Sequence, residues 1–114
     1  MNDEAQLLSV LQARKGRAKA VKRDELINIL RVRGVGITDR HMREMIKQLR
    51  RKGHLICSAP EEDGGYFMAE TYAEFEEFDR VEFSAKIADM SATRSAMVRK
   101  AKEVFGDAVQ VSLF

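Results

Sequence analysis

The stretch from Arg23 to Met68 constrains the fold more than any other, because its turn signals impose an order of short elements. Apolar residues recur at helical spacing from Arg23 to Val32, and Gly34 follows where a helix can end. These apolar residues are Leu26, Ile27, Ile29 and Leu30. The sequence therefore predicts a helix over residues 23–32 that closes on a tight glycine-containing turn.

A second helix is predicted directly after this turn. Thr38 offers a hydroxyl group as an N-cap, and Asp39 places a carboxylate in the first turn, where the helix dipole favours negative charge. The helix is expected to reach Lys52 and to end at Gly53. Its apolar stripe consists of Met42, Met45, Ile46 and Leu49. The opposite face is left to polar and charged side chains.

Two short runs of strand-forming residues follow, Leu55–Ser58 and Tyr66–Ala69, with the Gly64-Gly65 pair in the connection between them. They predict a β-hairpin. Upstream, a helix is expected over about residues 3–13, and the segment 20–22 is expected to add a third strand to the hairpin. This order is typical of a winged helix-turn-helix whose hairpin is the wing. The expected fold class is α+β, mostly α, with a long C-terminal helix.

A family resemblance is carried by Ile37–Arg43, Leu49–Ile56 and Gly64–Met68. These runs resemble the winged-helix DNA-binding proteins found in bacteriophages and prophages, and the resemblance covers about half of the chain. It implies a winged-helix fold that binds duplex DNA, with the helix that begins at Thr38 as the recognition helix. The same superfamily also includes modules used only for protein contact.

Charge is distributed unevenly along the chain, although the total is only +2. Residues 1–60 contain fourteen Lys or Arg against six Asp or Glu, which gives +8. Residues 61–114 contain six against twelve, which gives −6. A basic region is typical of nucleic-acid binding, because cationic side chains neutralise phosphates and release counterions. The alternative is a solvated basic face that pairs with the acidic half.

Polar side chains on the outer face of the Thr38 helix are candidates for reading DNA bases. Arg40 suits bidentate pairing with guanine, Glu44 can accept a hydrogen bond from cytosine, and Gln48 can pair with adenine. For each residue taken alone, the alternative is an ordinary solvent-exposed side chain.

Other residues are expected to contact phosphates and so to set the register without reading sequence. On the helix these are Arg43, Lys47 and Arg51. The link over residues 14–19 carries four more basic residues, and it either follows a phosphate strand or forms a mobile, soluble loop. The full set of expected DNA-binding residues is Thr38, Arg40, His41, Arg43, Glu44, Lys47, Gln48, Arg51, Lys19 and Lys22.

The tip of the expected wing departs from the usual pattern. It reads Glu61-Glu62-Asp63, where a wing that enters the minor groove normally carries Arg or Lys. Three carboxylates are repelled by phosphate. The wing is therefore expected to point away from DNA or toward a protein, with binding left to the recognition helix and the basic link.

Neither a metal site nor a catalytic constellation is expected. His41 and His54 have no Cys or carboxylate at metal-ligand spacing. Cys57 is the single cysteine and lies in an apolar strand pattern, so it is expected to be a buried structural thiol. The sequence predicts a non-enzymatic protein without a cofactor, because no Ser/His/Asp, Cys/His or phosphate-loop constellation appears. It predicts a cytoplasmic location, because no membrane span or signal peptide is evident.

A long helix is predicted beyond the hairpin. Thr71 can cap it, and residues 72–105 contain no Pro or Gly. A heptad seam alternates spacings of four and three, and it consists of Phe83, Ile87, Met90, Arg94, Met97, Ala101 and Val104. This seam predicts a homodimer. The alternative is a helix that folds back onto the first domain with Phe75 and Phe78 as core, and both arrangements can hold at once.

The last five residues resemble the short motif with which bacterial replication and repair proteins bind the DNA sliding clamp. They are Gln110, Val111, Ser112, Leu113 and Phe114. The resemblance implies that Leu113 and Phe114 fill an apolar pocket while the Gln110 amide hydrogen-bonds at its rim. The alternative is an apolar end that packs on the helix or adds a strand.

Together these patterns predict three parts: a winged helix-turn-helix domain over 1–70, a dimerising helix over 71–105 and a flexible clamp-binding tail over 106–114. The predicted function is that of a DNA-binding protein of phage or prophage type, associated with replication and tethered to the clamp. Two alternatives remain open at this point. One is a dimeric phage transcriptional regulator on an operator, and the other is a winged-helix adaptor that contacts only proteins.

Overall fold

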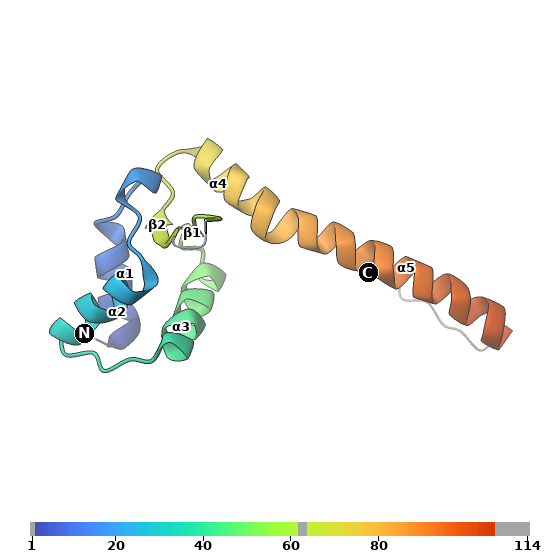
Figure 1. Ribbon diagram of the computed structural model, residues 1–114, viewed down its shortest axis with the longest axis horizontal. Helices are drawn as coiled ribbons and strands as arrows, with labels where there is room; N and C mark the ends of the chain where they lie inside the picture. Colours follow the sequence, from blue (N-terminus) through green and yellow to red (C-terminus); the bar gives the residue numbers. More distant parts are fainter. Residues whose placement is uncertain (1, 62–63, 107–114) are drawn as a thin grey trace. The chain divides into compact units, whose positions relative to one another are not determined.

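A computed structural model describes residues 2–61 and 64–106 (Figure 1). The chain is mostly helical, with one small antiparallel sheet and a long C-terminal helix. It divides into two compact units, Met1–Phe78 and Asp79–Phe114. The division falls after Phe78 because this aromatic side chain is buried with residues of the sheet.

The first unit contains three longer helices, a hairpin and the start of a fourth helix. Its elements are α1 (Asp3–Gln12), the 3₁₀ turn η1 (Arg17–Lys19), α2 (Arg23–Val32), α3 (Asp39–Arg51), β1 (Ile56–Ser58), β2 (Tyr66–Met68) and α4 (Tyr72–Asp79). The helices predicted over 3–13, 23–32 and 38–52 are confirmed to within one residue at each end. The predicted hairpin is also confirmed, with each strand one residue shorter.

Local capping explains why these bounds follow the sequence closely. Thr38 caps α3, since its Oγ1 accepts a hydrogen bond of 3.2 Å from the backbone N–H of His41. At the end of α2, Gly34 adopts a φ of +86°, and the N–H of Val35 donates to the carbonyl of Leu30 at 2.9 Å. This is a Schellman termination, which needs a residue that tolerates positive φ.

The sheet is smaller than expected. Cys57 of β1 pairs with Phe67 of β2 in an antiparallel register. Val21 exchanges backbone hydrogen bonds of 2.8 and 2.9 Å with Tyr66, so it adds one bridge to the hairpin. The third strand expected over residues 20–22 is therefore corrected to a single bridging residue. The two neighbours of Val21 serve as caps, because Ala20 is the C-cap of η1 and Lys22 is the N-cap of α2.

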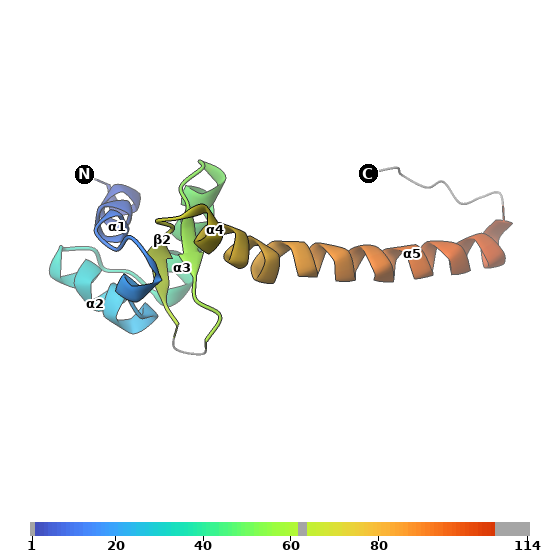
Figure 2. The same ribbon diagram turned by 90° about the horizontal axis from the view of Figure 1, so that it is seen from above.

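One apolar core joins the elements of the first unit. α3 contacts α1, α2 and β1, and α1 contacts β2 (Figure 2). The fully buried side chains are Leu7, Leu11, Val21, Leu26, Leu30, Met42, Ile46, Leu49, Ile56 and Cys57. The apolar stripes predicted for α2 and α3 therefore face inward, apart from Ile29, which is half-buried. A smaller cluster contains Cys57, Phe67 and Phe78.

The second unit is helical throughout its described part. A π-helical segment, η2 (Arg80–Ser84), is followed by α5 (Ala85–Phe105), and Gly106 ends the helix. The sequence predicted one uninterrupted helix over 72–105, so the π-helical segment is a correction. No glycine or proline marks it in the sequence. No residue of α5 is buried.

Candidate nucleic-acid interface

The outer face of α3 carries most of the residues expected to contact DNA. Its inner face is buried, whereas Arg40, His41, Arg43, Glu44, Lys47 and Arg51 are exposed and Gln48 is half-buried. Gln48 donates a hydrogen bond from Nε2 to Oε1 of Glu44 at 3.2 Å. Two of the expected base-reading side chains are therefore held together one turn apart, while Arg40 lies one turn before them.

Asp39 joins the first turn of α3 to the first turn of α2. Its Oδ2 lies 2.9 Å from Nε of Arg43 on the same helix, and its Oδ1 lies 3.4 Å from Nε of Arg23 on α2. The carboxylate thus holds two guanidinium groups at neighbouring helix starts. Sequence analysis missed Arg23 as a candidate DNA contact, because only the fold brings it next to the α3 face.

Arg50 has a different role from its neighbour Arg51. Its Nε donates a hydrogen bond of 2.8 Å to the backbone carbonyl of Ile56, and its guanidinium lies 4.8 Å from the ring centroid of Phe78. Such a cation–π contact adds to the hydrogen bond. Arg50 therefore connects α3 to the hairpin and to α4, although the helical pattern alone placed it among the outward polar residues.

The basic link before α2 forms a turn that is hydrogen-bonded to Met68 of β2. The backbone N–H of Gly16 donates to the carbonyl of Met68 at 2.9 Å, and that of Met68 donates to the carbonyl of Arg14 at 2.8 Å. Lys15 and Lys19 are exposed at this turn, and Lys22 is exposed at the N-cap of α2. These three lysines remain on the surface, where solvent or a ligand can reach them.

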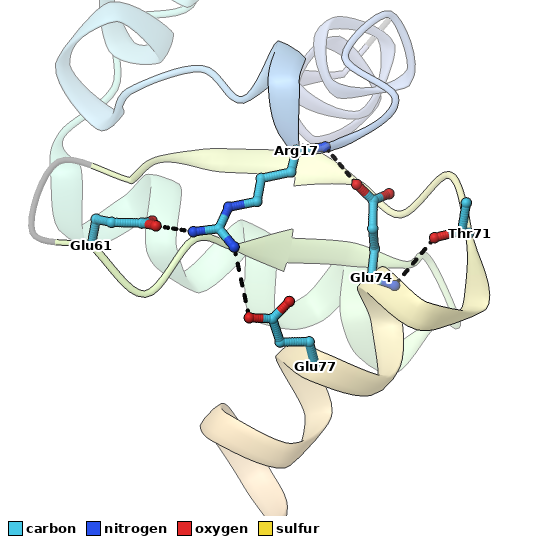
Figure 3. Close-up of polar contacts among 5 residues, drawn as sticks. All are labelled: Arg17, Glu61, Thr71, Glu74 and Glu77. Carbon is cyan, nitrogen blue, oxygen red and sulfur yellow. Dashed lines mark hydrogen bonds and ion pairs between the residues drawn. The ribbon is translucent and has the colours of Figure 1, made fainter.

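Arg17 is engaged within the first unit (Figure 3). Its guanidinium forms ion pairs with Glu61 of the hairpin connection and, at 3.7 Å, with Glu77 of α4. Arg17 therefore forms two ion pairs with carboxylates of this unit, while a phosphate contact of the link stays a prediction. The ion pair with Glu61 also accounts for one of the three carboxylates at the expected wing tip. Glu62 and Asp63 lie outside the described residues.

Glu74 fixes the same region through backbone hydrogen bonds. Its Oε2 accepts from the N–H of Arg17 at 2.8 Å and its Oε1 from the N–H of Glu70 at 2.9 Å, while its own N–H donates to Thr71 Oγ1 at 3.2 Å (Figure 3). Thr71 therefore caps α4 as predicted. The two backbone donors, first that of Arg17, hold the pKa of the Glu74 carboxyl below its ordinary value of 4.5.

A polar groove of about 430 Å³ lies between the start of α2 and the hairpin. Its lining consists of Lys22, Arg23, Asp24, Ser58, Ala59, Glu61, Gly64, Gly65 and Tyr66. At Gly65 the backbone approaches Val21 so closely that an added Cβ would lie 2.2 Å from the carbonyl oxygen of Val21. This contact explains why the hairpin needs a glycine at position 65.

Metal and thiol chemistry find little support in the described part of the chain. No cluster of three His, Cys, Asp or Glu side chains suited to a metal ion occurs within residues 2–61 and 64–106. Cys57 is buried as predicted, and this burial raises the pKa of its thiol to about 11. The thiol is therefore protonated at neutral pH.

The remaining expectations concern the termini and the membrane. Residues 110–114, which carry the clamp-like motif, lie outside the described residues. Among the helices that the structure does describe, none has both the length and the apolar character to cross a membrane. No protein family, curated protein or solved structure matches this chain.

Proposed function

We propose that the first unit is a winged helix-turn-helix module that binds duplex DNA, with α3 as its recognition helix. One observation carries the proposal. α3 buries four apolar side chains on one face and exposes a predominantly basic face on the other. An α-helix with such an outer face fits the major groove of B-DNA. The order of α1, the Val21 bridge, α2, α3 and the β1–β2 hairpin supports the winged-helix assignment.

The exposed residues divide into two proposed roles. Arg40, Glu44 and Gln48 read base edges, while Arg43, Lys47 and Arg51 contact phosphates. Arg23 joins the phosphate-contacting group, since Asp39 holds it close to Arg43. Thr38 and His41 lie at the start of the same helix, and Lys19 and Lys22 extend the basic surface.

We further propose that the protein is associated with replication and that residues 110–114 tether it to a bacterial sliding clamp. The support is the sequence of the tail alone. A dimeric transcriptional regulator is the second candidate, because the exposed seam of α5 suits a dimer. Clamp binding separates the two candidates, since an operator-binding regulator has no need of a clamp.

DNA binding is tested by fluorescence anisotropy of the full chain on labelled mixed-sequence duplexes at several salt concentrations. The log of the affinity should fall by about 0.9 per contacted phosphate for each log unit of salt. A variant with Arg40, Arg43 and Lys47 all replaced by Ala should bind at least about tenfold more weakly and show a shallower salt slope. The matched control replaces Arg31, Arg33 and Lys86 by Ala, three exposed side chains outside α3 and outside the proposed DNA contacts.

The control removes the same number of positive charges from side chains that do not belong to α3. It should retain most of the affinity and the slope. Equal losses in both variants would mean that binding follows only the net charge. Absence of binding by the wild-type chain at low salt would overturn the DNA assignment and favour a protein-contact module.

The clamp tether is tested with a purified bacterial clamp and the double variant Leu113→Ala, Phe114→Ala. The wild-type chain should bind the clamp with micromolar affinity, as is typical of a short segment that becomes ordered on binding. The double variant should lose clamp binding and keep its DNA affinity. Absence of clamp binding by the wild-type chain would make the transcriptional regulator the better candidate.

A further inference from the structure

The exposed face of α5 is apolar at regular intervals. Among the seam residues, Ile87 is 62% exposed, Met90 70%, Met97 69% and Val104 59%. Phe83, in the π-helical segment, is 42% exposed. Apolar side chains exposed at such regular intervals along a helix favour a contact with another protein.

We propose that α5 pairs with the α5 helix of a second copy of this chain, and that the two helices run antiparallel. This inference does not depend on DNA binding or on the clamp. It concerns the partner of the second unit and the direction in which that partner lies.

The spacing of the exposed residues favours a second helix as the occupant of this face. Spacings of four and three repeat from Phe83 to Val104, an average of 3.5 residues. A seam with this period stays on one side of a helix that coils around another helix. A globular partner could contact this helix without apolar residues that repeat every 3.5 positions over the whole seam. The α5 helix of a second copy carries the same seam, so its apolar face has the length needed to cover this one.

The charges along the helical segment favour the antiparallel direction. Residues 79–89, at the start of the second unit, carry three Asp or Glu against two Lys or Arg, a net charge of −1. Residues 90–105 carry four Lys or Arg against one Glu, a net charge of +3. A parallel pair places the two basic halves of the helices side by side. An antiparallel pair separates the two basic ends and places each of them beside the slightly acidic start of the other second unit, and such charge complementarity favours one orientation.

Arg94 supports the same direction. It occupies the middle of the seam, between Met90 and Met97. In a parallel pair in register, each Arg94 faces the Arg94 of the partner, and two like charges at a buried layer are unfavourable. In an antiparallel pair, the two core positions of the heptad face each other, so Arg94 faces Met90 or Met97 of the second copy rather than its Arg94.

The direction has a consequence for the proposed DNA-binding units. Each first unit precedes α5 in its own chain, so antiparallel pairing attaches the two units at opposite ends of the paired helices. Parallel pairing attaches both units at the same end. The antiparallel arrangement suits a protein that holds two separate DNA segments rather than adjacent half-sites.

Disulfide cross-linking of the full chain tests the direction. Three variants each carry one new cysteine in the seam: Ile87→Cys, Met97→Cys and Val104→Cys. Each is oxidised alone and in pairwise mixtures, with far-UV circular dichroism to confirm the fold. We expect covalent dimers in mixtures of Ile87→Cys with Met97→Cys or Val104→Cys, and few or none when Ile87→Cys or Val104→Cys is oxidised alone.

The wild-type chain is the control, and it should not cross-link, because Cys57 is buried. Efficient cross-linking of Ile87→Cys and of Val104→Cys each with itself would overturn the antiparallel direction in favour of the parallel one. Light scattering tests the pairing itself. The wild-type chain should have a dimer mass at tens of micromolar, and Met90→Lys with Met97→Lys should give a monomer mass. A monomeric wild-type chain would overturn the proposal.

Discussion

Asp39 and Arg23 connect the first turns of two helices, since Oδ1 of Asp39 lies 3.4 Å from Nε of Arg23. The same carboxylate holds Arg43 at 2.9 Å. An acidic residue at a surface proposed to bind phosphate is unfavourable by charge alone. Because Asp39 lies within ion-pair distance of two arginines, we expect it to orient both guanidinium groups before a ligand binds.

The variant Asp39→Asn tests this positioning role. Removal of one negative charge should by itself tighten DNA binding. We expect instead binding that is roughly fivefold weaker, or about 1 kcal/mol, because both arginines lose their orientation. Asp24→Asn, which removes the same charge from the first turn of α2, is the control and should bind DNA as tightly as the wild type or more tightly. Tighter binding by both variants in anisotropy measurements would count against positioning.

Two adjacent arginines should give opposite results. Arg50→Ala loses the hydrogen bond to the Ile56 carbonyl and the contact with Phe78, so it should lower the free energy of unfolding by about 1–3 kcal/mol. Arg51→Ala removes an exposed side chain and should change that free energy by less than about 0.5 kcal/mol. In DNA binding, Arg51→Ala should reduce the salt slope by about 0.9.

Urea denaturation and anisotropy of both arginine variants provide the comparison. A stable Arg50→Ala variant would show that the connection from α3 to the hairpin is dispensable. An unchanged salt slope in Arg51→Ala would remove Arg51 from the phosphate-contacting group.

Gly65→Ala should be among the most destabilising single substitutions in the first unit. Gly65 has a φ of +73°, and its new Cβ would lie 2.2 Å from the carbonyl oxygen of Val21. We expect a loss of about 3 kcal/mol or more in the free energy of unfolding. Gly34 also has a positive φ, but a Cβ added there meets no atom within 4 Å. Gly34→Ala should therefore lower the free energy of unfolding by only about 1–2 kcal/mol. Equal losses of stability for the two variants in thermal denaturation would show that the hairpin can move away from Val21 to accommodate the new Cβ.

The lowered pKa of Glu74 predicts that the stability of the chain depends on pH. Its carboxyl has a pKa below 4.5 in the folded chain, so the unfolded chain binds a proton at higher pH than the folded chain does. The stabilisation is therefore complete above pH 4.5 and is lost as the pH falls through the lower folded pKa. Glu74→Gln should lower the melting temperature at pH 7, and the difference from wild type should shrink at low pH. A difference in melting temperature that stays the same from pH 7 to low pH would contradict a stabilising role of the ionised Glu74 carboxylate.

The first unit was largely predictable because local signals define its elements. Thr38, Gly34 and Gly53 mark helix ends by backbone chemistry that needs no tertiary neighbour. The apolar stripes then showed which faces are buried. The single bridge at Val21 was overestimated as a strand, since strand length depends on where the flanking helical turns stop.

The roles of individual arginines were less predictable. Arg17, Arg23 and Arg50 all engage side chains or backbone that lie at least six residues away in sequence. Helical periodicity assigns a residue to a face, but it does not say whether a long side chain turns back toward the fold. The π-helical segment over residues 80–84 was likewise missed, since its composition is that of an ordinary helix.

The burial of Cys57 gives the chain a built-in reporter of local opening. The thiol lies opposite Phe67 in the hairpin and packs in one cluster with Phe78. A thiol reagent can react only when this cluster separates, so the rate of modification of the wild-type chain measures how often it does. The modification rate should then be compared with and without DNA. A slower rate with DNA would show that binding at α3 also reduces the opening of the hairpin, even if DNA does not contact the hairpin.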